Sequence, residues 1–138
     1  MAVVLLGWLF MGWLAALSVI DLRQHRLPNV LTLPGAAVIL LVACLHGRGV
    51  AALWGAAALA AVYLLMHLLA PAAMGAGDVK LALGLGAVTG ALGVGAWVLA
   101  ALLAPVVTAV WGLVTRARVL PHGPSMCLAT ALVLVISA

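Results

Sequence analysis

Acidic side chains are almost absent from this sequence. Its 138 residues include only two carboxylates, Asp21 and Asp78, and charged residues of both signs make up 6% of the chain. Soluble domains average about 25% charged residues, so a composition this poor in charge excludes an ordinary soluble core. Apolar residues instead reach 69% of the chain, and we predict an integral membrane protein.

Patterns that bind metals or nucleic acids are missing as well. The two cysteines fit no zinc spacing, and no two of the four histidines are placed to share a helix at positions i and i+4. We therefore predict no metal site and no cofactor. The six lysines and arginines form no basic stripe with aromatic residues, so we expect contacts with membrane lipids and no nucleic-acid partner.

The N-terminal run MAVVLLGWLF lacks the features of a removable signal peptide. No basic residue precedes it, and nothing after Ile20 resembles a small-residue cleavage site. We therefore interpret this run as the first membrane span.

Long apolar runs are what the chain has in abundance. Crossing a hydrocarbon core of about 30 Å takes roughly 20 helical residues. The runs are continuously apolar, whereas the strands of a membrane barrel alternate, so helices are expected. The sequence predicts an all-α membrane protein, a polytopic bundle of about six transmembrane helices forming a single transmembrane domain over residues 1–138. The predicted spans are Val3–Ile20, Val30–Leu45, Ala51–Ala70, Val79–Leu92, Val94–Val114 and Met126–Ala138.

The division between the fourth and fifth spans follows from length. No charged residue occurs between Lys80 and Arg116, and one helix over positions 81–115 would be about 52 Å long, well beyond a bilayer. Glycines 90, 93 and 95 offer the turn. The last run is short for a crossing, so five full spans with one partial helix is an open alternative.

The basic residues then indicate the orientation of the bundle, because cytoplasmic loops carry the excess of Lys and Arg. The first, third and fifth loops hold five of the six basic residues, and the second loop holds only Arg48. We predict that the odd loops face the cytoplasm, that the N-terminus lies outside, and that both aspartates lie at the cytoplasmic face. Cys44 and Cys127 fall near opposite faces, which disfavours a mutual disulfide. The five basic residues of the odd loops are Arg23, Arg26, Lys80, Arg116 and Arg118.

The two acids have a structural and a functional interpretation. Asp78 follows Gly77 at the start of an apolar helix and could cap it, while Asp21 could be a hydrated residue just past a span. However, a carboxylate at membrane depth costs several kcal/mol and usually serves function or pairing. Two carboxylates that approach closely cannot both ionise easily and come to share a proton, which equips them for hydrolysis. Glycines 75 and 77 would let a bound peptide approach Asp78.

Three motifs, in order, resemble those of type IV prepilin peptidases. DLRQHRLPNVLTLP from Asp21 is similar to the family's first catalytic region, GAGDVKL from Gly75 to its G-x-G-D-x-K-L region, and LPHGPSMCLA from Leu120 to its late P-x-G-P turn. The resemblance implies an aspartic endopeptidase of the cell membrane, with its active site at the cytoplasmic face. It would remove the basic leader from type IV prepilins or pilin-like proteins.

Residue by residue, the resemblance assigns the catalytic acids to Asp21 and Asp78. Pro28 and Asn29 are expected to fix the turn into the second span, and Lys80 to act as an orientation residue at the interface, or less strongly to favour ionisation of Asp78. The remaining supporting residues expected from the motifs are Gly75, Gly77, Pro121, Gly123 and Pro124.

Two departures from the family pattern change these expectations. The chain starts with a span and has no N-terminal domain with paired Cys-x-x-Cys motifs, so the minimal form of the family is expected, without methyltransferase activity. The late turn carries His122 where the family usually has a large apolar residue, and a titrating histidine near the acids could alter the pH profile.

Two other functions share some of these sequence features. A presenilin-like intramembrane protease shares a G-x-G-D acid but lacks the other two motifs. A small proton-coupled transporter component would need acids near the midplane and inverted half-repeats, whereas both acids here lie near one interface.

Overall fold

Six α-helices make up the fold, and the computed structural model describes residues 1–71, 75–116 and 121–137. No strand occurs within these ranges, so the predicted all-α class is confirmed. The helices are α1 (Ala2–Gln24), α2 (Asn29–Leu45), α3 (Gly49–Leu69), α4 (Ala76–Leu92), α5 (Val94–Thr115) and α6 (Gly123–Ser137).

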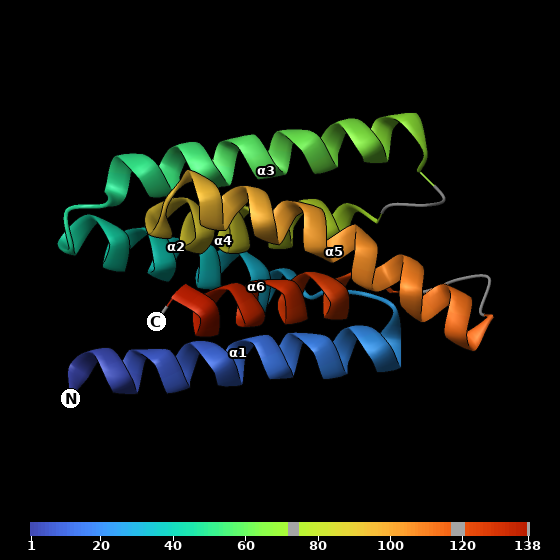
Figure 1. The fold of residues 1–138 in the computed structure, drawn as a ribbon, viewed down its shortest axis with the longest axis horizontal. Coiled ribbons are helices and arrows are strands. Elements are labelled where there is room, and N and C mark those ends of the chain that lie inside the picture. The colour runs from blue at the N-terminus through green and yellow to red at the C-terminus, as the bar shows by residue number, and fades with distance from the viewer. Residues whose placement is uncertain (72–74, 117–120, 138) are drawn as a thin grey trace.

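Successive helices run in opposite directions along the long axis of the bundle (Figure 1). As a result, the first, third and fifth connections lie at one end, and the second and fourth lie at the other. Both chain termini lie at the end opposite the odd connections (Figure 1). The alternating hairpins predicted from the lengths of the apolar runs therefore agree with the arrangement of the helices.

Helix α4 is the centre of the bundle, in contact with α2, α3, α5 and α6. Its closest neighbour is α3, because glycines on both helices let the backbones approach. A Cβ added at Gly55 would overlap the backbone of Gly86 and Gly90. Close backbone packing through small residues is typical of helices in membranes, where apolar burial does not drive association.

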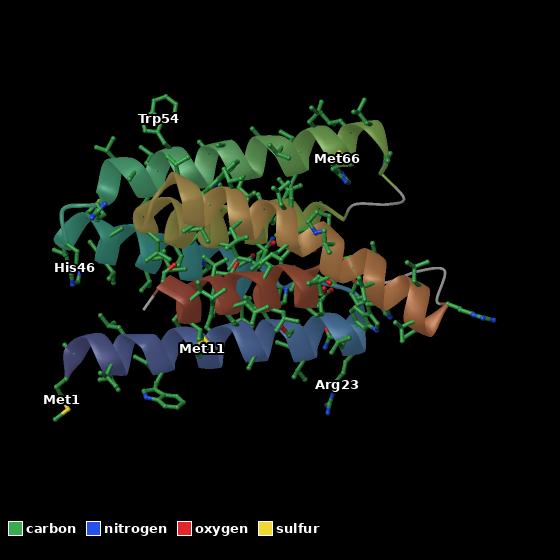
Figure 2. All side chains as sticks on the ribbon, in the orientation of Figure 1. Met1, Met11, Arg23, His46, Trp54 and Met66 are labelled. Atoms are coloured by element: carbon green, nitrogen blue, oxygen red, sulfur yellow. The ribbon has the colours of Figure 1, made fainter. Side chains whose placement is uncertain are left out.

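The outer surface of the bundle is apolar, with Trp54 pointing away from α3 and large side chains such as Trp8 and Leu113 more than 70% exposed (Figure 2). A surface of this kind is suited to lipid. Three helices, α1, α3 and α5, are long and apolar enough to cross a membrane. Helix α6 has 15 residues and a length of about 22 Å at 1.5 Å per residue.

Three helices extend about one turn beyond the predicted spans, into polar sequence. Helix α1 continues past Ile20 to Gln24, α4 begins before Val79, and α6 begins before Met126. Hydrophobicity marks where the apolar stretch stops, whereas helical hydrogen bonding continues until the backbone leaves the α region. In α1 this happens at His25, which is left-handed with φ 51°. Asp21 therefore lies inside α1, not beyond its end.

Candidate active site

A cavity of about 500 Å³ opens at the end of the bundle that holds the odd connections. Its lining comes from the end of α1, the starts of α2 and α4, and the turn before α6. Nearly all the predicted site residues meet there, although they are spread over a hundred positions of sequence. The lining residues are Asp21, His25, Arg26, Leu27, Pro28, Asn29, Gly75, Ala76, Gly77, Asp78, Lys80, Pro121 and His122.

Asp21 lies in the last turn of α1 with its side chain only 4% exposed. Its Oδ2 accepts a hydrogen bond of 3.0 Å from the backbone N–H of Gly123, the first residue of α6. The amides of a first helical turn have no partner within the helix and favour an anion. The Asp21 carboxylate thus lies at the N-terminus of α6, a helix that is distant from Asp21 in sequence.

Gly123 and Pro124 explain why α6 can receive this carboxylate. A Cβ at position 123 would overlap the Asp21 carboxylate, so only glycine permits the contact. Pro124 lies in the first turn of α6, where a missing amide donor leaves no helical hydrogen bond unmade. The predicted P-x-G-P turn is therefore adjacent to the first acid.

Asp78 lies in the first turn of α4 and is 8% exposed. Its Oδ2 lies beside Gly75, with whose backbone amide the carboxyl interacts, and it is close enough to Asp21 for an electrostatic interaction. An acid in the first turn of a helix also helps to satisfy the free amides there. The structural interpretation of Asp78 as a helix-start residue and its place in the cavity are therefore compatible.

Gly77 lets the two acid-bearing segments pack together. A Cβ at this position would come within 3.1 Å of Cβ of Leu27, which is itself buried. Leu27 precedes Pro28, the residue that caps α2 with an extended backbone at ψ 137°. Pro28 therefore lies at the turn into α2.

Lys80 and Asn29 join the same two segments through their side chains. The Lys80 Nζ donates a hydrogen bond of 2.7 Å to Oδ1 of Asn29, so the first turn of α4 is linked to the first residue of α2. The sequence predicts an interfacial lysine and an asparagine that can bond nearby backbone. The structure adds a hydrogen bond between the two side chains, a contact across 51 positions that local patterns do not reveal.

His122 is the centre of a polar cluster that the sequence did not predict. It is buried, with Nε2 3.0 Å from the Tyr63 hydroxyl of α3 and Nδ1 2.7 Å from Oγ1 of Thr108 in α5. Burial lowers the pKa of His122 to about 4, so its imidazole is neutral at physiological pH. The departure from the family pattern at position 122 was the only signal in the sequence. Nothing singled out Tyr63 or Thr108, because each is one of a few scattered polar residues in an apolar helix.

Neither cysteine contributes to the cavity lining. Cys44 is exposed and Cys127 is buried, and both are free. Among the residues that the structure describes, no three His, Cys or acidic side chains are grouped so that they could hold a metal ion. Arg118 and Leu120, cited above for topology and for the late motif, lie outside the described residues.

Comparison with protein-family models decides the affiliation, since residues 8–113 match the type IV leader peptidase family. The chain belongs to this family. No curated protein and no solved structure gives a match. The matched range contains both aspartates and ends before the turn at Pro121–Pro124. This type IV leader peptidase family member is accordingly a membrane peptidase, and the resemblance inferred from the three motifs is confirmed at the level of the family.

Proposed function

We propose that this peptidase is an aspartic endopeptidase that removes the leader from type IV prepilins or pilin-like proteins, with Asp21 and Asp78 as its catalytic pair. The observation that carries the proposal is that the chain's only two acids, 57 positions apart in sequence, line one cavity at one end of the bundle. An isolated carboxylate at membrane depth is energetically costly. The convergence of both aspartates on one cavity of a peptidase therefore supports a catalytic role for them.

The surroundings of the two acids support different roles. The hydrogen bond from the Gly123 amide favours the charged form of Asp21, and the nearby charge of Asp21 favours the protonated form of Asp78, so we assign Asp21 the role of general base. It takes a proton from the attacking water, while Asp78 in its protonated form donates to the oxygen of the scissile carbonyl. The pair then returns a proton to the leaving amine as the C–N bond breaks. Titration of activity would belong to the pair and not to either residue.

The supporting residues hold this pair in place. Lys80 and Asn29 fasten α4 to α2, Gly77 lets the segment of Asp78 pack on Leu27, and Pro28 caps α2. Gly75 begins α4 as its N-cap, and the Pro121–Pro124 turn brings Gly123 to Asp21. These residues act by position, and no proton transfer is assigned to them.

The substrate enters from the side that carries the odd connections, which we assign to the cytoplasm on the basis of their basic residues. A prepilin presents a basic leader followed by an apolar helix, so its cleavage site would lie at the membrane surface. The cavity is at that level in the bundle, because it is built from helix ends.

Processing of a co-expressed prepilin tests the proposal. Asp21→Asn and Asp78→Asn should each slow leader removal by at least about 100-fold, because general acid–base catalysis contributes that much. The readout is the mobility shift that accompanies loss of the leader, with membrane levels of each variant measured in parallel. Arg23→Gln is the matched control: Arg23 is on the same helix as Asp21, exposed and pointing away from the bundle (Figure 2).

Full processing by either asparagine variant would disprove the catalytic pair. If the wild type left every prepilin intact but cleaved a helix of another membrane protein, and did so only with both acids present, the pair would stand and the substrate assignment would be wrong.

A further inference from the structure

His122 connects the start of α6 to α3 and α5 through hydrogen bonds of its two ring nitrogens. Nδ1 lies 2.7 Å from Oγ1 of Thr108, and Nε2 lies 3.0 Å from the Tyr63 hydroxyl. Each hydroxyl can donate or accept a hydrogen bond, so one neutral tautomer donates to Thr108 and accepts from Tyr63, and the other does the reverse. Both ring nitrogens are used, and a neutral imidazole fits both bonds.

The position of this cluster in the chain connects it to Asp21. His122 immediately precedes Gly123, the residue whose N–H reaches Asp21 Oδ2. The hydrogen-bond partners of His122 come from α3 and α5, two helices that contribute no residue to the cavity lining. Tyr63 and Thr108 thus hold the His122 side chain in the turn before α6, while the backbone amide of the next residue, Gly123, contacts Asp21.

We infer that His122 is a positioning residue that, held by Tyr63 and Thr108, keeps the first amide of α6 on the Asp21 carboxylate. The catalytic consequence of this inference rests on the proposed function, whereas the structural link between the cluster and the Gly123 amide does not. A phenylalanine at position 122 would leave the buried Tyr63 hydroxyl without its hydrogen-bond partner. The cluster is therefore a polar alternative to apolar packing of this turn.

The Gly123 amide can be observed directly in the full-length protein. The sequence contains only two His–Gly pairs, His46–Gly47 and His122–Gly123. Labelling histidine carbonyls with ¹³C and glycine amides with ¹⁵N therefore gives two signals in a spectrum that selects adjacent labelled residues. The variant His46→Gln removes one of them and so assigns the other to Gly123.

The expected result is a graded response of this signal. The Gly123 amide proton should resonate downfield in the wild type, because its acceptor is a carboxylate, and move upfield in Asp21→Asn. Tyr63→Phe and Thr108→Val should each move it part of the way toward that value. Thr115→Val is the matched control: Thr115 is in the same helix as Thr108 and makes the same kind of bond to its own helix, to the Trp111 carbonyl, so this change should leave the signal in place.

Enzyme kinetics supply the second readout. Tyr63→Phe and Thr108→Val should lower kcat about threefold to tenfold with KM unchanged, as expected for loss of one hydrogen bond. The acid limb of the pH–rate profile should move to higher pH, because the charged form of Asp21 loses support from the amide. His122→Gln, which keeps one donor and one acceptor, should retain more activity than His122→Phe. A role in folding alone would lower the amount of active enzyme without moving the profile.

The two readouts separate the two ideas. The inference would be overturned if the Gly123 signal kept its wild-type chemical shift in both Tyr63→Phe and Thr108→Val, or in Asp21→Asn. This holds whether or not the protein cleaves prepilins. A graded signal in a wild type that cleaves no prepilin would leave the positioning link intact and refute the proposed function.

Discussion

The first amide of α6 reaches Asp21 because position 123 carries no side chain. Gly123→Ala would place a methyl group on the carboxylate, so either Asp21 or the start of α6 has to move. A misplacement of about 1 Å can reduce an enzymatic rate by about 100-fold, and we expect a loss of that order in prepilin processing. The measurement is the rate of leader removal by purified enzyme, normalised to folded protein.

Gly12→Ala provides the control for this prediction. Gly12 is an exposed glycine of α1 with nothing within 4 Å of an added Cβ, so the same chemical change there should leave the rate unchanged. Equal rates for Gly123→Ala and the wild type would show that the contact between Gly123 and Asp21 is dispensable for activity.

The buried imidazole of His122 predicts that stability depends on pH. Its pKa is about 4 in the folded protein and 6.5 in the unfolded chain. Between these values the unfolded state binds a proton at His122 that the folded state does not, so the contribution of His122 to stability is constant above pH 6.5 and falls as the pH is lowered toward 4. The loss is at most about 3 kcal/mol.

Thermal melting in detergent at several pH values tests this prediction. The wild type should lose more of its Tm between pH 6.5 and 4 than His122→Gln, which cannot titrate there. The comparison is needed because Asp21 and Asp78 share the cavity with His122 and are present in both proteins. Parallel curves for the two proteins would mean that His122 does not contribute to the pH dependence.

At the scale of single residues, the sequence singled out the two acids and the motif residues around them, but not the side-chain contacts that hold these residues together. Asp21 and Asp78 could be singled out because they are the only carboxylates in an apolar chain. The bond between Lys80 and Asn29 and the cluster of Tyr63, Thr108 and His122 arise from packing between helices. No local pattern encodes such contacts, and isolated polar residues in apolar helices give no indication of their partners.

Among the helices, the contact between α3 and α4 is the one most sensitive to side-chain size. Gly55→Leu would insert a side chain where the backbones of Gly86 and Gly90 lie. Overpacking of this kind costs about 1–3 kcal/mol, so we expect a clearly lower Tm. Activity should fall with it, because α4 carries Asp78.

Ala57→Leu is the comparison on the same helix. Ala57 is exposed on α3, so added volume there faces lipid and should change the Tm little. If both variants melted at the wild-type temperature, the close approach of α3 and α4 would not be a determinant of stability.

The helices themselves were predictable to within about one turn, and the errors have one cause. Span prediction follows hydrophobicity, which ends at the membrane interface, whereas the helices end where the backbone leaves the α region, as at His25 and at Gly75. This difference matters for the site. It moves Asp21 inside α1 and gives its carboxylate the fixed position of a helical side chain.

On the scale of the whole molecule, the odd connections lie together at one end of the bundle, opposite both termini (Figure 1). Alternation of antiparallel hairpins could be predicted because apolar runs of limited length must turn back. Which end faces the cytoplasm is a separate prediction that rests on loop charge alone. It decides from which side a substrate reaches the cavity.

Thiol labelling in intact cells tests this orientation. Arg23 and His46 lie at opposite ends of the bundle (Figure 2), so Arg23→Cys and His46→Cys, each in a Cys44→Ser background, report on the two sides. The remaining thiol of Cys127 is buried and serves as the blank. A membrane-impermeant maleimide should label the His46→Cys protein in intact cells and the Arg23→Cys protein only after permeabilisation.

The reverse pattern would mean that the cavity faces the outside of the cell. Prepilin leaders in the cytoplasm could then not be its substrates. Labelling of both before permeabilisation would contradict the bundle's division into two membrane faces.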